Sequence, residues 1–166
     1  MKQFLLKIPV NSLNVHDILN CVIHSILFQR LMIPIQPKDE QMHLEDSVIY
    51  WVKINNSTIS ATVDQKVHEI IQQGQRQCII RFFYNIPQSW FLSKQQFYES
   101  WLIQLQYKET DYAVELDDII QQILNNSLNP IPKLGKDKEL GYDIQFLNNW
   151  SQGLFGRLLD VQPSLL

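Results

Sequence analysis

The stretch from residue 78 to residue 107 constrains the fold most, because it reads as two strands joined by a loop. Residues 78–84 form a β-branched and aromatic run, which is typical of a largely buried strand. From residue 97 to 107 the odd positions are mostly large and apolar and the even positions are more polar, so one face of a second strand should be buried. Residues 85–96 include Pro87 and many polar side chains, which predicts a loop outside the sheet.

That predicted loop contains Trp90 and Phe91, followed by Leu92. Leaving a large apolar side chain in water costs about 1.5–3 kcal/mol, so the aromatic pair should either fold back over the sheet edge or meet a partner. Trp and Phe are residues that protein interfaces favour, and polar residues on both sides keep the pair out of a continuing strand. Insertion into a membrane is a third interpretation, but only Lys94 is nearby to meet anionic lipid.

Three amphipathic helices are predicted around these strands. Their apolar residues recur at helical spacing over residues 15–27, 59–71 and 113–124, with Gly74 as the stop of the second helix. Further strands are predicted at 4–10, 47–54 and 142–146, and a polar loop is expected up to Asp46. The order β-α-β-α-β-β-α followed by a tail predicts an α+β domain, with the helices packed on a largely antiparallel sheet.

The length and charge of the chain fit a single domain and argue against nucleic acid as its main partner. The chain has 166 residues, a net charge of −3 and no cluster of Lys and Arg. Cys21 and Cys78 stand in apolar contexts and form no disulfide framework. We expect no signal peptide and no membrane span, and hence a reducing cytosolic setting in which the Asn-x-Ser/Thr sequences are chance matches.

Residues that could carry chemistry are few. His16, Cys21 and His24 share the first helix, but a metal site needs three or four converging ligands, so packing or a helix-surface position is favoured. Asp117 and Asp118 are adjacent on a helix and point in different directions, as in a solvated first turn. No phosphate-binding or hydrolase motif is present, and no metal or other cofactor is expected.

Cys78 leaves an enzymatic alternative open. A chain of this length could be a ubiquitin-like conjugating enzyme that forms a thioester on this cysteine. A reactive thiol needs partial exposure and a polar or cationic setting, whereas Cys78 begins a strand that reads as buried and has only Arg76 and Arg81 nearby. Solvent inaccessibility of Cys78 would count against this hypothesis.

Several segments, in this order, resemble the autophagy-related protein 101 family, whose members are HORMA-domain subunits of the autophagy-initiation kinase complex. The first strand and helix are similar, including a His-x-x-Leu-x-x-Arg ending at Arg30. The run at 80–84, the pair Trp90–Phe91 and the run at 101–103 match the family's strand, aromatic finger and strand, and residues 160–163 match a tail motif. In the family a proline can separate the two finger aromatics, whereas here they are adjacent.

The resemblance implies a HORMA fold and a protein that is not an enzyme. Residues 1–166 would form a single HORMA domain, with a protruding finger loop at 86–96 and a short region resembling the safety belt at 131–166. The domain would pair with the HORMA domain of autophagy-related protein 13 and stabilise it. Trp90 and Phe91 would recruit downstream autophagy factors to the phagophore assembly site, in the cytoplasm and without stable membrane insertion.

Two further expectations follow from the resemblance. Three residues follow Pro163, fewer than in longer family members, so we expect a fixed open form rather than a belt closed over a peptide. A HORMA adaptor of another pathway, such as checkpoint or DNA-damage control, is the alternative, and identification of the partner would separate the two.

Overall fold

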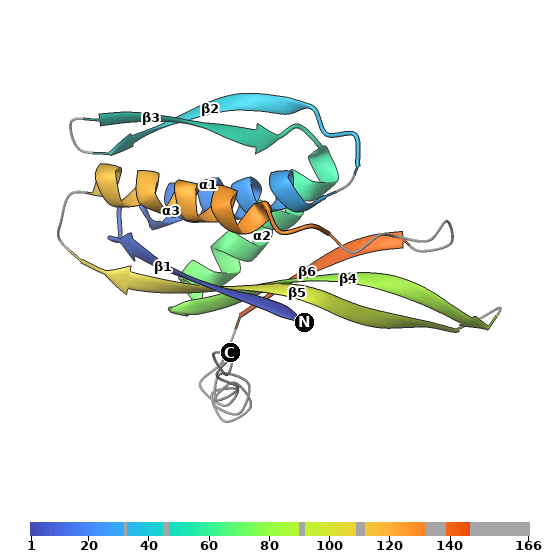
Figure 1. Cartoon of the computed structure of the whole chain (residues 1–166). Helices are drawn as coiled ribbons and strands as arrows, with labels where there is room; N and C mark the ends of the chain where they lie inside the picture. Colours follow the sequence, from blue (N-terminus) through green and yellow to red (C-terminus); the bar gives the residue numbers. More distant parts are fainter. Residues whose placement is uncertain (32, 45–46, 90–91, 109–111, 132–138, 147–166) are drawn as a thin grey trace, which may run out of the picture.

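The computed structural model describes residues 1–31, 33–44, 47–89, 92–108, 112–131 and 139–146. Within these residues the chain forms three layers: a four-stranded sheet, three helices on one of its faces, and a two-stranded sheet on the far side of the helices (Figure 1). This arrangement is the α+β architecture that the sequence predicts, and it is consistent with a HORMA fold.

The four-stranded sheet is built mainly from antiparallel pairs. Its order is β1 (Lys2–Val10), β5 (Leu92–Tyr107), β4 (Gln77–Ser89) and β6 (Glu139–Phe146). β4 pairs antiparallel with both β5 and β6, and β1 pairs parallel with β5. Because β1 is an edge strand, Pro9 near its end does not interrupt a central ladder, as expected for this residue.

The three helices are α1 (Val15–Arg30), α2 (Ser57–Gln72) and α3 (Tyr112–Ser127). α1 is the most buried of them and contacts α2, α3 and β3, which confirms the predicted central helix. The Asn56 side chain accepts a hydrogen bond from the backbone N–H of Ile59 and so caps α2. α2 is followed by Gly74 at φ +61°, a left-handed conformation that Gly adopts without steric penalty.

The second sheet corrects the predicted polar loop before Asp46. β2 (Pro37–Leu44) is a strand that pairs along its whole length with β3 (Ser47–Ile54), antiparallel. Only Met42 and Leu44 of β2 are fully buried, so its sequence carries little of the alternation typical of a strand. Backbone pairing with β3, rather than its own apolar pattern, therefore decides that this segment is a strand.

The predicted loop at residues 85–96 is also wrong over its described part. β4 continues to Ser89 and β5 begins at Leu92, and the two strands stay paired through Ile86↔Lys94 and Pro87↔Ser93. Pro87 is tolerated because β6 accompanies β4 only as far as Asn85, so beyond that point β4 has one neighbouring strand instead of two among the described residues.

A buried ion pair lies between the sheet and the helices, next to a bulge in β5. The register shifts opposite Phe82 and Phe83, so Tyr98 has no partner across the ladder, and Tyr98 and Glu99 are both buried. Arg30, at the end of α1, donates from Nε to Glu99 Oε1 at 2.7 Å and pairs through Nη2 with Glu99 Oε2. Arg30 Nη1 also donates to the carbonyls of Ser127 and Asn129, both at 3.0 Å. One guanidinium therefore joins α1, β5 and the end of α3.

Candidate functional site

The β4–β5 hairpin extends beyond the rest of the sheet. β6 pairs with β4 only as far as Asn85, and β1 pairs with β5 only from Glu99 onward. Past these residues β4 and β5 are paired, within the described part of the chain, only with each other, up to Ser89↔Leu92, and Figure 1 shows the hairpin projecting from the layers. Pro87 and residues 93–96 are exposed. We call residues 86–89 and 92–96 the hairpin extension.

Aromatic packing fixes the base of the hairpin extension. The rings of Phe83 and Phe97 meet edge to face with centroids 5.4 Å apart, and the Arg81 guanidinium lies 4.7 Å from the Phe97 ring centre. Arg81 Nη2 also pairs with Asp143 Oδ2 of β6 at 2.8 Å. Gly141 of β6 lies directly beneath Phe83, where a Cβ would come within 2.6 Å of its ring. These contacts set the direction in which the hairpin extension leaves the sheet.

The predicted finger residues Trp90 and Phe91 lie outside the described residues. In the sequence they stand between Ser89 and Leu92, which are paired with each other. The structure thus describes the two strands that lead to and from the aromatic pair. Sequence reasoning identified the pair but missed these strands, because the polar side chains and Pro87 mask a segment held by backbone pairing.

A second candidate site is an apolar groove of about 250 Å³ on the opposite side of the helix layer. α1 forms its floor, and β3 and α3 form its walls. Tyr50 and Leu124 line the groove, yet they keep 75% and 39% of their surface exposed. Asp117 of α3 is also part of its lining. Large exposed apolar side chains beside a groove mark a place where another surface can bind. Sequence reasoning missed this groove, which needs three elements brought together.

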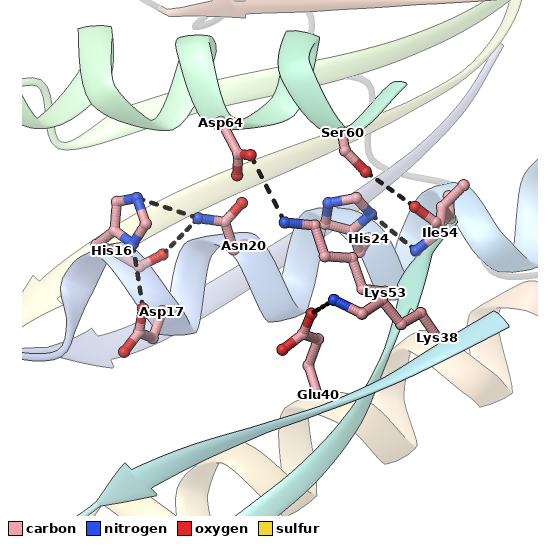
Figure 2. Close-up of polar contacts among 10 residues, drawn as sticks. All are labelled: His16, Asp17, Asn20, His24, Lys38, Glu40, Lys53, Ile54, Ser60 and Asp64. Atoms are coloured by element: carbon pink, nitrogen blue, oxygen red, sulfur yellow. Dashed lines mark hydrogen bonds and ion pairs between the residues drawn. The ribbon is translucent and has the colours of Figure 1, made fainter. Parts of the chain in front are cut away.

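The histidines of α1 are separate features (Figure 2). His16 Nδ1 lies 3.1 Å from Asp17 Oδ1, at the exposed start of the helix. His24 is buried, and its Nδ1 accepts a hydrogen bond from the backbone N–H of Ile54 at 3.3 Å. Burial, and then the nearby Lys53 charge, lower the pKa of His24 to about 4. His24 is therefore a neutral residue that attaches β3 to α1.

Metal binding has no support within the part of the chain that is described. No three His, Cys, Asp or Glu side chains among those residues converge in a way that could hold a metal ion. Asp117 and Asp118 are both exposed. None of the described helices is long and apolar enough to cross a membrane.

Cys78 lacks the setting of a nucleophile. Its side chain is 1% exposed, and burial raises its pKa to about 12, so the thiol is protonated at neutral pH. Burial likewise raises the pKa of Cys21 to about 12. The inaccessibility of Cys78 counts against a thioester-forming enzyme.

Comparison with known proteins gives the family. The family described as Autophagy-related protein 101 matches residues 7–138 of this chain. Autophagy-related protein 101 of Arabidopsis thaliana is 27% identical over 108 residues, which cover 60% of this chain and 49% of the relative. The chain thus matches about half the length of that curated relative. Because the family match extends over most of its residues, the chain belongs to the autophagy-related protein 101 family.

Proposed function

We propose that this chain is a non-enzymatic adaptor of autophagy initiation. It pairs with the HORMA domain of autophagy-related protein 13 and stabilises it. Its Trp90–Phe91 pair recruits downstream autophagy factors to the phagophore assembly site in the cytoplasm. Membership of an autophagy-related family supports the pathway, and the buried, protonated Cys78 removes the one nucleophile that the sequence offered for an enzymatic alternative.

The proposed recruiting role is supported chiefly by the way the hairpin extension projects from the sheet. Its described strands project past β1 and β6 with only each other as neighbours. A paired hairpin with a packed aromatic base loses little further conformational entropy when it binds, so it suits the presentation of two anchor residues. Trp and Phe are among the aromatic residue types that are enriched in the cores of protein interfaces.

The apolar groove is where we place the partner domain. Tyr50 and Leu124 stand on opposite walls, so one partner surface laid along α1 would cover both. Burying exposed apolar area stabilises a complex by about 25 cal/mol per Å² before the costs of association. The groove and the hairpin extension are built from different elements, so one molecule can use both at once.

Light scattering after gel filtration tests the pairing. The chain is measured alone and then mixed with the HORMA domain of autophagy-related protein 13 from the same species. The mixture should contain a one-to-one complex. A folded sample that forms no complex would overturn the pairing. Unbiased partner capture would then test the alternative of a HORMA adaptor in another pathway.

Two variants separate the two surfaces. Tyr50→Asp combined with Leu124→Asp changes exposed positions of the groove and should abolish the complex while leaving the fold intact. Trp90→Ala combined with Phe91→Ala should leave the complex intact and block autophagy in cells. Loss of the complex in the Trp90/Phe91 variant would instead assign the aromatic pair to the partner interface.

A further inference from the structure

The apolar groove borders one edge of β3. Four consecutive residues of the strand line the groove, from Ile49 to Val52, and no described residue of β2 does. Successive side chains of a strand point to opposite faces, so the part of β3 that all four residues present to the same groove is the backbone. β3 pairs with β2 along its other edge, and among the described residues no third strand joins this sheet. The groove therefore lies along the free edge of β3.

The end of the β2–β3 ladder shows which backbone groups point toward this free edge. The N–H of Asn55 donates to the carbonyl of Gln36 at 2.9 Å, so Asn55 points its N–H toward the β2 side. In an antiparallel ladder such residues alternate with residues whose N–H and C=O both point away from the partner strand. Ile54 is of the second kind. Its N–H donates to His24 Nδ1 at 3.3 Å, and its carbonyl accepts from Ser60 Oγ at 2.9 Å (Figure 2).

The same alternation turns the backbone groups of Tyr50 and Val52 outward. These residues lie four and two positions before Ile54, so their N–H and C=O groups point toward the free edge, about 7 Å apart along the strand. Side chains of α1 and α2 bind the outward groups of Ile54, but no hydrogen bond within the described residues involves those of Tyr50 and Val52. The free edge therefore offers two donors and two acceptors to a binding partner.

This part of the edge lacks the features that block the addition of another strand. Charged residues and proline protect exposed edges in native sheets. The edge strand β1 contains Lys2, Lys7 and Pro9, and residues 37–40 of β2 are one proline and three charged residues. Residues 48–52 of β3 contain neither proline nor charge and are all β-branched or aromatic, the types that favour strands. This edge is therefore suited to accept a strand.

The opposite wall of the groove is apolar and carries one acidic group. Leu116, Ile120 and Leu124 of α3 line it, and Asp117, which is exposed, is the one charged side chain among the described lining residues. A strand added beside β3 would direct every second side chain onto this apolar wall and bring a Lys or Arg to Asp117. A helix in the same place would leave the outward backbone groups of β3 without partners.

We propose that the partner which binds the groove contributes an extended strand, and that this strand adds to the free edge of β3 at Tyr50 and Val52. It carries apolar side chains at alternate positions and a Lys or Arg that meets Asp117. This inference rests on the proposed pairing with the HORMA domain of autophagy-related protein 13 through the groove. It adds the form of the contact, which is a sheet that continues from β2 and β3 into the partner.

Val52→Pro tests the strand addition in the full chain. Proline removes an N–H that β2 does not use, and its ring blocks an added strand, so this edge position should still fold. Val52→Ala keeps the N–H and is the matched control. In calorimetric titration with the HORMA domain of autophagy-related protein 13, Val52→Pro should bind about tenfold or more weakly than Val52→Ala. Equal affinities of the two variants would overturn the strand addition.

Amide exchange measured by NMR keeps the proposal testable if Val52→Pro does not fold. In the complex, the N–H groups of Tyr50 and Val52 should exchange about tenfold or more slowly than in the free chain, because a partner strand accepts them. The N–H of Ile54 is already donated to His24 and should change less. A complex in which Tyr50 and Val52 exchange as in the free chain would overturn the strand addition alone. A folded chain that forms no complex would overturn the pairing and this inference together.

Asp117→Lys tests the predicted cationic residue of the partner strand. Asp118 is also exposed but is not among the described lining residues, so Asp118→Lys is the matched control. At low salt, Asp117→Lys should weaken the complex by about threefold or more, and Asp118→Lys should change it less. Equal effects of the two substitutions would contradict a Lys or Arg placed at Asp117.

Discussion

Strands β4 and β5 are paired from Gln77↔Gln104 to Ser89↔Leu92, yet the two halves of this hairpin have different surroundings. In the inner half, β1 and β6 flank the pair and the helices cover one face, so Ile80, Phe82, Trp101 and Ile103 are fully buried. In the hairpin extension no other described strand pairs with β4 or β5, and most described side chains there are exposed. Strand pairing alone therefore does not decide burial, since burial depends on which other elements lie alongside.

From this difference we predict that the inner half serves stability and the hairpin extension serves recognition. The inner half carries a buried ion pair and the packed core, where a single change is expected to cost several kcal/mol. The hairpin extension contributes little to the core, so its sequence is free to serve binding. Four predictions test this division, from the largest expected effect to the smallest.

Glu99→Leu should be the most destabilising change. It leaves the Arg30 guanidinium buried without its carboxylate and removes the acceptor of the Trp101 indole N–H, which lies 2.6 Å from Glu99 Oε1. Removing one partner of a buried pair costs about 3–5 kcal/mol. Urea unfolding followed by tryptophan fluorescence would measure the loss.

The matched control is Arg30→Leu combined with Glu99→Leu, which leaves no uncompensated charge. We expect this double variant to be more stable than Glu99→Leu alone. If the two substitutions simply add, the ion pair is not the reason for the sensitivity of the inner half.

Lowering the pH should destabilise the helix layer through His24. Its pKa is about 4 in the folded protein, against an ordinary value of 6.5, so between these two values the unfolded chain binds more protons. Stability therefore falls as the pH is lowered from 6.5 to 4, by up to roughly 3 kcal/mol from this group, and levels off below that window. Urea unfolding at a series of pH values measures the slope.

His24→Asn is the control for this pH dependence. Asn can still offer an acceptor to the Ile54 N–H but does not titrate, so the slope between pH 6.5 and 4 should shrink. An unchanged slope would mean that His24 is not the group responsible for the pH dependence.

Gly141→Ala tests the boundary between the two halves. The new Cβ would lie 2.6 Å from the Phe83 ring, so that ring must move from its contact with Phe97. Overpacking of this kind costs about 1–3 kcal/mol, measurable by thermal unfolding. Phe83→Leu removes the clashing ring atoms, so Gly141→Ala should lower the stability less in the Phe83→Leu protein than in the unchanged protein. An equal loss of stability in both proteins would mean that the ring is not the obstacle.

Trp90→Ala combined with Phe91→Ala should have the smallest effect on stability, within about 0.5 kcal/mol, as for surface positions away from the core. Thermal unfolding of the variant beside the unchanged protein checks this value. A loss of several kcal/mol would mean that both rings are part of the core, and the division between the two halves of the hairpin would fail.

The sequence alone determined the elements whose periodicity is strong. The apolar spacing of α1 predicted a central buried helix, and Gly74 marked the end of α2 because a left-handed residue there favours glycine. The alternation predicted for residues 97–107 is confirmed at Trp101, Ile103 and Leu105, but it is wrong at Tyr107, which is exposed, and at Tyr98 and Ser100, which are buried. The resemblance carried by short ordered motifs gave the family, which the comparison confirms over residues 7–138.

Only the tertiary structure decided the features that depend on distant neighbours. β2 and the hairpin extension are strands because a partner strand satisfies the hydrogen bonds of their backbone groups. No sequence pattern within those segments predicts this pairing. The apolar groove needs α1, α3 and β3 together. Arg30 and Glu99 are 69 residues apart, and only the fold brings the end of α1 against the buried carboxylate of β5. Local periodicity reports only which side of a segment is buried, whereas register, bulges and ion pairs depend on where other parts of the chain arrive.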